Sequence, residues 1–303
     1  MLSYRHAFHA GNHADVLKHF LLIQLSHYLG QKDKPFWIID THAGAGLYEL
    51  DTGYATKLKE YESGIGKLWT REDLPAALAD YVDQVRACNP DGSLRFYPGS
   101  PWLALQTLRP QDRLRLFELH SSDSKILQDN FENQGRRVSV TTANGFDALK
   151  ALLPPPPRRA LVLIDPPYET HDDYPNVIAA LQEGLSRFAT GTYAVWYPQL
   201  ARLDAQQLPD KLKRLPAKDW LNVTLTVEEA PDPRATSLAQ QGAPAVDRNH
   251  LAPVLLRRLA ARIESWRTGD PSLAADYRAR SVTIGSQVRA SLPGDRSVEG
   301  VAE

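Results

Sequence analysis

The chain has a single cysteine, Cys88, so it cannot form an internal disulfide bond. It has no apolar run of about 18 residues, which a membrane span would need, and its amino end lacks the pattern of a signal peptide. These absences favour a reducing, cytoplasmic location. An excess of one charge is also missing, because 35 Lys and Arg residues face 36 Asp and Glu residues. Any contact with a polyanion must therefore depend on local patches.

Two common ligand motifs are absent as well. No Gly-Lys-Ser/Thr sequence of a P-loop is present, and His9, His13 and His19 do not have the spacing of a zinc site, so no metal is expected. What the chain does have is length: 303 residues that are 43% hydrophobic can bury a large core. One domain with an insertion or appendage is the organisation that this length favours.

The most informative segment is residues 160–168, with the sequence ALVLIDPPY. Its first five residues are apolar without polar alternation, which predicts a strand buried on both faces. Proline cannot continue a hydrogen-bonded ladder, so Asp165 is expected at the carboxyl end of that strand, where open α/β sheets bind ligands. A plain strand followed by a proline turn is the alternative interpretation.

Residues 165–168 have the chemistry to hold the exocyclic amine of a nucleobase. Asp165 can accept one N–H group and the carbonyl of Pro166 the other, and Tyr168 offers a flat face for an unstacked base. The two prolines remove donors and fix φ, which keeps that carbonyl available. We therefore predict Asp165, Pro166 and Tyr168 as catalytic residues for direct methyl transfer to N6 of adenine.

A second buried strand is predicted at residues 36–40, followed by the glycine turn THAGAG at residues 41–46. Such a turn lets the backbone approach a ligand closely, and Gly44 is the expected cofactor contact. The glycine pattern alone is weak. Combined with the proline motif it fits S-adenosylmethionine better than a dinucleotide, because no further glycine stands at the dinucleotide spacing.

The remaining pattern alternates strands and helices, which predicts a doubly wound α/β domain with a helical insertion at about 50–95. An amphipathic helix through Leu29 is expected to precede the first strand, and Ser100 is expected to cap a helix that runs to Leu108. Further strands are predicted at 114–118, 138–142, 193–197 and 221–227, and further helices at 124–131, 146–153, 174–188 and 203–215.

Polar side chains near these strand ends are candidate ligand contacts, although each has a plainer interpretation. Glu118 could accept both ribose hydroxyls or simply end a strand at the surface, and Asn144 could be only a turn residue. His42 could cap a helix, and Lys18 could be a solvated charge. The carboxyl ends of parallel strands converge on one crevice, which favours a common site.

These motifs closely resemble the bacterial ribosomal RNA large subunit methyltransferase J family over roughly residues 1–230. The matching segments are MLSYRH at 1–6, the histidine-rich stretch at 9–19, DTHAGAG at 40–46, YPGSP at 97–101, DPPY at 165–168 and TGTYAVWYP at 190–198. The resemblance implies a class I, Rossmann-like methyltransferase that uses S-adenosylmethionine. It also implies N6-methylation of an adenine in 23S ribosomal RNA, with naked RNA as the substrate of a monomeric enzyme.

The same resemblance implies roles for individual residues. Those that it assigns to the cofactor site are His19, His42, Ser100, Glu118, Asn144, Gly145 and Asp165. Those that it assigns to an amino-terminal cover over the substrate are Tyr4, His6 and Lys18. The family usually has Asp where Asn144 stands. Asn can still accept a hydrogen bond from the adenine amine of the cofactor, but it lacks the charge, so weaker cofactor binding is expected.

Residues 231–303 depart from the family, whose sheet is closed at this point by a hairpin. Here the segments 231–238, 247–266 and 277–288 resemble the end of a biotin-protein ligase, without its ATP loop or its biotin-site lysine segment. We expect no ligase activity from this tail. Loss of the closing hairpin would leave unpaired backbone at residues 193–197 or 221–227.

Two alternative functions stay open at this point. The predicted amine clamp does not read the sugar, so a DNA adenine N6-methyltransferase fits the same residues, and only the resemblance favours RNA. A catalytically impaired RNA-binding protein is the other alternative, because the last part of the sheet is replaced.

Overall fold

The computed structural model describes residues 6–51, 58–225, 287–292 and 296–301. The chain divides into two compact units, Met1–Pro253 and Val254–Glu303. In the second unit, strands β8 (Gln287–Leu292) and β9 (Arg296–Val301) form an antiparallel pair. The domain boundary that the sequence places after residue 230 lies outside the described residues and stays a prediction.

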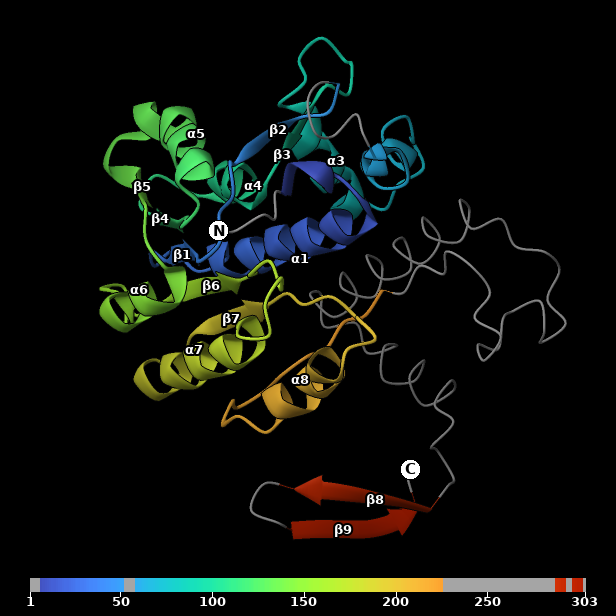
Figure 1. The fold of residues 1–303 in the computed structure, drawn as a ribbon, viewed down its shortest axis with the longest axis vertical. Coiled ribbons are helices and arrows are strands. Elements are labelled where there is room, and N and C mark those ends of the chain that lie inside the picture. Colours follow the sequence, from blue (N-terminus) through green and yellow to red (C-terminus); the bar gives the residue numbers. More distant parts are fainter. Residues whose placement is uncertain (1–5, 52–57, 226–286, 293–295, 302–303) are drawn as a thin grey trace, which may run out of the picture. The chain divides into compact units, whose positions relative to one another are not determined.

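The first unit is built on a five-stranded sheet in which every pair of neighbouring strands is parallel (Figure 1). Its order is β5 (Val138–Thr141), β4 (Arg113–Phe117), β1 (Trp37–Asp40), β6 (Ala160–Ile164) and β7 (Thr192–Val195). The sheet confirms the predicted doubly wound α/β class. All five residues of β6 are buried, as expected from the absence of polar alternation in this run.

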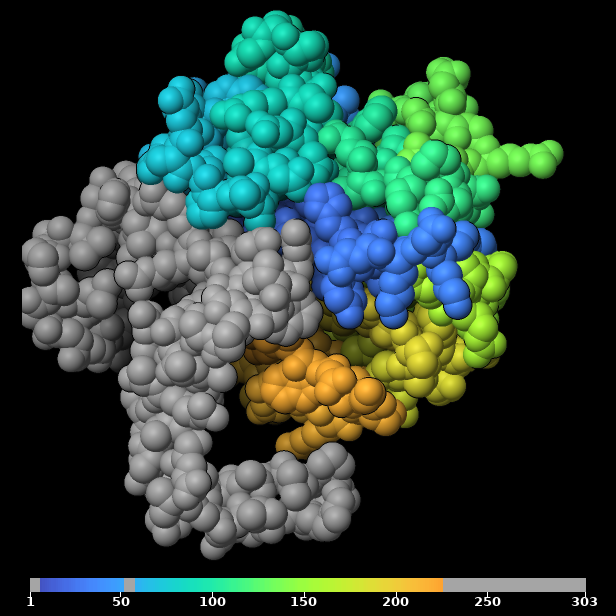
Figure 2. Space-filling view, turned by 180° about the vertical axis from the view of Figure 1, so that it is seen from behind, coloured from blue at the N-terminus to red at the C-terminus, as the bar shows by residue number. Residues whose placement is uncertain are grey.

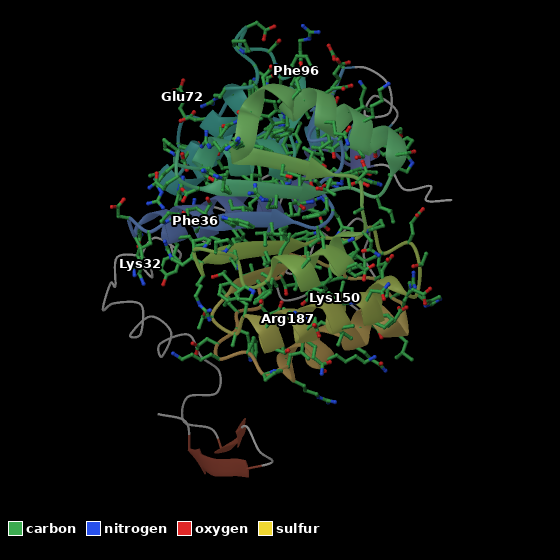
Figure 3. The ribbon with its side chains drawn as sticks, turned by 90° about the vertical axis from the view of Figure 1, so that its left-hand side faces the viewer. Lys32, Phe36, Glu72, Phe96, Lys150 and Arg187 are labelled. Atoms are coloured by element: carbon green, nitrogen blue, oxygen red, sulfur yellow. The ribbon has the colours of Figure 1, made fainter. Side chains whose placement is uncertain are left out.

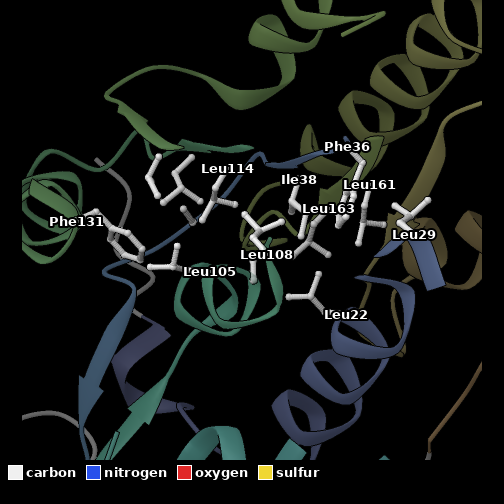
Figure 4. Close-up of a cluster of buried hydrophobic side chains, with 14 of the residues drawn as sticks. Leu22, Leu29, Phe36, Ile38, Leu105, Leu108, Leu114, Phe131, Leu161 and Leu163 are labelled. Carbon is white, nitrogen blue, oxygen red and sulfur yellow. The ribbon is translucent and has the colours of Figure 1, made fainter. Parts of the chain in front are cut away.

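Helices cover both faces of this sheet (Figure 1). One face carries α1 (His13–Gly30), α4 (Ser100–Thr107) and α5 (Ser121–Phe131); the other carries α6 (Gly145–Leu152), α7 (Asp173–Arg187) and α8 (Leu203–Lys213). Successive strand residues point to opposite faces. Ile38 therefore packs with Leu22 of α1 and Leu105 of α4 (Figure 4), whereas Ile39 packs in the cluster that contains Val177 and Leu208.

The predicted insertion corresponds to the segment between β2 (Leu47–Glu49) and β3 (Phe96–Pro98), which pair in antiparallel fashion. It contains two short 3-10 helices, η2 (Glu60–Glu62) and η3 (Ile65–Lys67), and helix α3 (Ala76–Arg86). In the space-filling view its cyan and teal residues form the top of the unit (Figure 2). The insertion contacts the turn before α1, where Ile65 donates its N–H to the carbonyl of Gly11 at 2.9 Å.

Three details differ from the sequence expectations. Helix α1 is buried around most of its circumference rather than amphipathic, because α3, α4 and β6 all contact it. Ser100 is the first residue of α4 and Gly99 precedes it as the cap, so the hydroxyl of Ser100 is used elsewhere. The described residues 221–225 form no strand, and 226–227 lie outside the described part.

No helix of the described residues is long and apolar enough to cross a membrane.

Candidate active site

A cavity lies at the carboxyl edge of the sheet, where the loops after β1, β4, β5 and β6 meet α1 and the start of α4. The predicted site residues that line it are His6, Lys18, His19, His42, Gly44, Ser100, Glu118, Asn144, Gly145, Asp165 and Pro166. Tyr4 lies outside the described residues, and Tyr168 does not line the cavity. The parallel topology explains this convergence, because all these loops leave the sheet at the same edge.

The glycine turn after β1 holds the carboxylate of Glu118. Gly44 has φ +60° and donates its N–H to Oε2 of Glu118 at 2.8 Å, and His120 donates its N–H to Oε1 at 2.7 Å. Burial raises the pKa of Glu118. A Cβ at Gly44 would lie 2.3 Å from the hydroxyl of Tyr48, so a side chain there would strain the backbone and displace Tyr48. The fixed carboxylate keeps lone pairs for a ligand with vicinal hydroxyls.

Two uncharged histidines, the buried His19 and the half-buried His42, form walls of the cavity. Burial lowers the pKa of His42 to about 4 and the pKa of His19 to about 3, so both are uncharged at neutral pH. Nδ1 of His42 lies 2.8 Å from the hydroxyl of Thr41, and its ring meets the edge of Phe146 at a centroid distance of 4.7 Å. Nδ1 of His19 lies 2.7 Å from a tyrosine hydroxyl inside the core. Uncharged rings suit a cationic ligand better than imidazolium groups would.

Asp40 forms a hydrogen bond with the glycine turn, and the site prediction did not include it. Its carboxylate is buried and accepts hydrogen bonds from the hydroxyl of Ser100 at 2.7 Å and from the N–H of His42 at 3.2 Å. Burial raises the pKa of Asp40 to about 6. The available sequence signal was its position as the last residue of the apolar run FWIID, directly before the turn.

The turn after β5 is tightly packed against the turn after β1. Asn144 caps α6, because its Oδ1 accepts the N–H of Phe146 at 2.9 Å. A Cβ added at Gly145 would lie 2.1 Å from the carbonyl oxygen of Thr41, so only glycine allows this approach. Asn144 is therefore a turn residue and also part of the cavity wall, so the two interpretations are compatible.

A chain of charges links α1 to the acid of the proline motif. Nζ of Lys18 lies 2.7 Å from Oδ2 of Asp165 and 3.0 Å from Oδ1 of Asp15, whose Oδ2 is 2.8 Å from Nε2 of His6. Burial opposes the charge of Asp15, but His6 and Lys18 outweigh it and hold its pKa well below the ordinary value. Sequence reasoning missed Asp15. Lys18 links it to Asp165, which lies 147 positions after Lys18 in the chain.

Tyr168 is placed differently from the prediction. It has φ +53°, its side chain turns into the core, and only 4% of the residue is exposed. Its hydroxyl donates to the carbonyl of Trp196 at 2.7 Å, and its ring packs on Tyr174 at 5.0 Å. In this position the ring supports the turn after β6 and offers no free face to a base.

Within the described residues, no group of three His, Cys, Asp or Glu side chains is arranged to hold a metal ion. The cavity is also lined by Tyr48, Asp123, Phe146 and Asn176, which the sequence did not single out. Their contribution depends on which loops meet in space, and no short motif marks it.

The amino-terminal unit has close curated relatives. The chain is 48% identical to ribosomal RNA large subunit methyltransferase J of Haemophilus influenzae over 235 residues, which cover 77% of this chain and 83% of the relative. It is also 48% identical to the protein of the same name from Escherichia coli over 227 residues, 75% of this chain and 81% of the relative. The crystal structure of protein LPL1258 from Legionella pneumophila matches with a TM-score of 0.65 and 39% identity, covering 69% of this chain and 77% of that one.

The carboxyl-terminal part has a different likeness. It is similar to biotin–[acetyl-CoA-carboxylase] ligase of Mycobacterium tuberculosis, with 60% identity over 82 residues, which are 27% of this chain and 30% of the ligase. The family model described as ribosomal RNA large subunit methyltransferase D, RlmJ, matches residues 33–254. That match covers most of the chain and contains the cavity-lining loops of the sheet. The chain therefore belongs to the RlmJ family of ribosomal RNA large subunit methyltransferases.

Proposed function

We propose that this rRNA methyltransferase transfers the methyl group of S-adenosylmethionine to N6 of one adenine in 23S ribosomal RNA, before that RNA is assembled into the ribosome. The observation that carries the proposal is the position of Asp165, which lines the same cavity as the glycine turn at Gly44 and the fixed carboxylate of Glu118. The cavity thus combines a group that can accept N–H bonds from an amine with a group that can accept vicinal hydroxyls. This combination suits methyl transfer from one nucleoside group to another.

The residues present fit the cofactor. Glu118, held by two backbone N–H groups, can accept the ribose hydroxyls, and Asn144 and Phe146 stand beside it for the adenine ring. The carboxylates of Glu118 and Asp165, together with the neutral ring of His42, favour a ligand that carries a positive charge. When bound, S-adenosylmethionine would supply an electrophilic methyl group.

Asp165 and the Pro166 carbonyl orient the target amine. Each accepts one N–H group, which directs the nitrogen lone pair away from the ring and toward the methyl carbon. As the new N–C bond forms and the sulfur–carbon bond breaks, the nitrogen becomes positively charged and must lose a proton. Asp165 is the base in contact with it, and its side chain is 18% exposed, so the proton can pass on to water.

The ammonium of Lys18 is bound to the proposed amine acceptor. It lies 2.7 Å from Asp165 and is also held by Asp15 at 3.0 Å. We propose that the entering amine takes the place of the Lys18 ammonium at Asp165, while Asp15 retains it nearby. His6 would contact the substrate from the same side, since it is bound to Asp15. The substrate contact expected of Tyr4 lies outside the described residues and stays a prediction.

The test is single-turnover methyl transfer to unmethylated 23S rRNA by the full chain and by Asp165→Asn. We expect the variant to lose at least about 100-fold in rate, because the amide neither accepts as strongly nor takes up the proton. Calorimetry should show that it still binds S-adenosylmethionine. Asp129→Asn, an exposed acid on α5, is the matched control and should keep the wild-type rate. A variant Asp165→Asn with wild-type rate would contradict the proposal.

A further inference from the structure

Basic residues stand at the amino ends of four neighbouring strands of the sheet. Lys34 precedes β1, Arg113 begins β4, Arg137 precedes β5, and Arg159 precedes β6. The register places these starts side by side, because Trp37 pairs with both Arg113 and Ala160. The cations therefore form a row along the edge of the sheet opposite the cavity, which we call the amino-edge basic row.

Contacts within the row leave its charge uncompensated. Arg113, Arg137 and Arg159 donate to main-chain carbonyl oxygens, which satisfy hydrogen bonds without cancelling a positive charge. In the described part of the chain, none of the three forms an ion pair with a carboxylate. The buried acid of this edge, Asp112, is already paired with Arg109 at 2.8 Å.

Further cations extend the row into solvent. Lys32, Lys34, Arg136 and Arg158 are all exposed. Figure 3 shows Lys32 beside Phe36, at the end of the sheet where β1 begins. The same edge segments contain two exposed acids, Asp33 and Glu132, so positive charge predominates there. A chain whose total charge is −1 thus concentrates cations on one edge.

We propose that the amino-edge basic row binds the phosphate backbone of the RNA substrate, outside the catalytic cavity. Neighbouring strands lie about 4.8 Å apart, so the four strand starts span about 15 Å, a length over which a nucleic-acid backbone presents more than one phosphate. The row and the cavity lie at opposite ends of the strands, so one RNA reaches both only if it is long enough to follow the surface. This inference rests on the proposed function and adds a second contact area for the same substrate.

The test uses the full chain with Lys32→Gln, Lys34→Gln, Arg136→Gln and Arg158→Asn combined. These side chains are exposed, and Asn tolerates the φ of +51° at position 158. At about 0.1 M salt we expect KM for a long 23S rRNA fragment to rise by about tenfold or more, with kcat unchanged at saturating RNA. The slope of log Kd against log salt concentration should become shallower by about 3 to 4, since each of the four lost phosphate contacts accounts for about 0.7 to 0.9.

The matched control removes four other exposed cations, Lys125, Lys150, Lys211 and Lys218, each replaced by Gln. It changes the net charge equally and should keep the wild-type KM and salt slope. Equal values for the wild type and the edge variant, or an equal loss in the edge variant and the control, would overturn the inference. Failure of the proposed function is distinguishable, because the wild type itself would then transfer no methyl group to the RNA.

Discussion

Replacing Asp40 with Asn should remove a specific pH dependence from the stability of the domain. The carboxyl group of Asp40 is buried, and burial raises its pKa from 3.8 to about 6. The folded state therefore binds more protons than the unfolded state between these two values. Since stability rises with pH only where the unfolded state binds more protons, the contribution of Asp40 falls as pH rises from about 4 to about 6.

The size of the effect follows from the shift. About two pKa units correspond to about 3 kcal/mol at pH 7, relative to an Asp40 that ionised normally. Asn cannot ionise, and it can keep both hydrogen bonds, because its oxygen can accept the N–H of His42 and its amide can donate to the hydroxyl of Ser100. The free energy of unfolding of Asp40→Asn, minus that of the wild type, should therefore increase by about 2.5 kcal/mol from pH 4 to pH 7, because a small part of the effect already lies below pH 4.

Urea unfolding of both proteins at half-unit steps between pH 4 and pH 8 measures this difference. His19 and His42 act in the opposite direction, because their lowered pKa values cost stability as pH falls below their ordinary values near 6.5. They are present in both proteins, so their effect cancels in the difference. A difference that stays constant over this pH range would refute the assignment of Asp40 as a buried acid with a raised pKa.

Three further substitutions test other parts of the site. Gly145→Ala places a Cβ 2.1 Å from the carbonyl oxygen of Thr41. It should cost about 2 kcal/mol of stability, measured by urea unfolding, and weaken cofactor binding, measured by calorimetry. Wild-type values of both would contradict the close packing. Asp15→Asn removes the charge that holds the Lys18 ammonium and should lower the methyl-transfer rate by about tenfold or more. An unchanged rate would exclude a positioning role for Asp15. Tyr168→Phe keeps the ring but loses the hydrogen bond to Trp196, which should cost about 1 kcal/mol with KM for RNA unchanged; a raised KM would instead indicate that the hydroxyl serves the substrate.

Local patterns were sufficient for the central strands and for most of the cavity wall. The apolar run at 160–164 predicts β6 with its observed bounds, because a strand covered on both faces needs no polar residue along its length. The predicted strand at 36–40 is observed as Trp37–Asp40. The turns that follow them line the cavity, since a parallel sheet brings all its carboxyl ends to one edge.

Contacts between distant segments could not be predicted in this way. The carboxylate of Asp15 reaches the site only because Lys18 bridges it to Asp165, and no local pattern marks such a pair. Tyr168 adopts a positive φ that is rare for an aromatic residue, and this turns its ring into the core. The alternating segment at 221–227 predicts a strand, yet the described residues 221–225 have no strand partner, and β propensity alone does not hold a strand in place.

The identity of the methylated nucleoside tests the central claim most directly. Unmethylated 23S rRNA and duplex DNA, incubated separately with the full chain and methyl-labelled S-adenosylmethionine, should be digested to nucleosides and analysed by mass spectrometry. The account predicts label in N6-methyladenosine from the rRNA, at close to one methyl group per molecule, and none from the DNA. Label in another nucleoside, in the DNA alone, or in neither nucleic acid would contradict it.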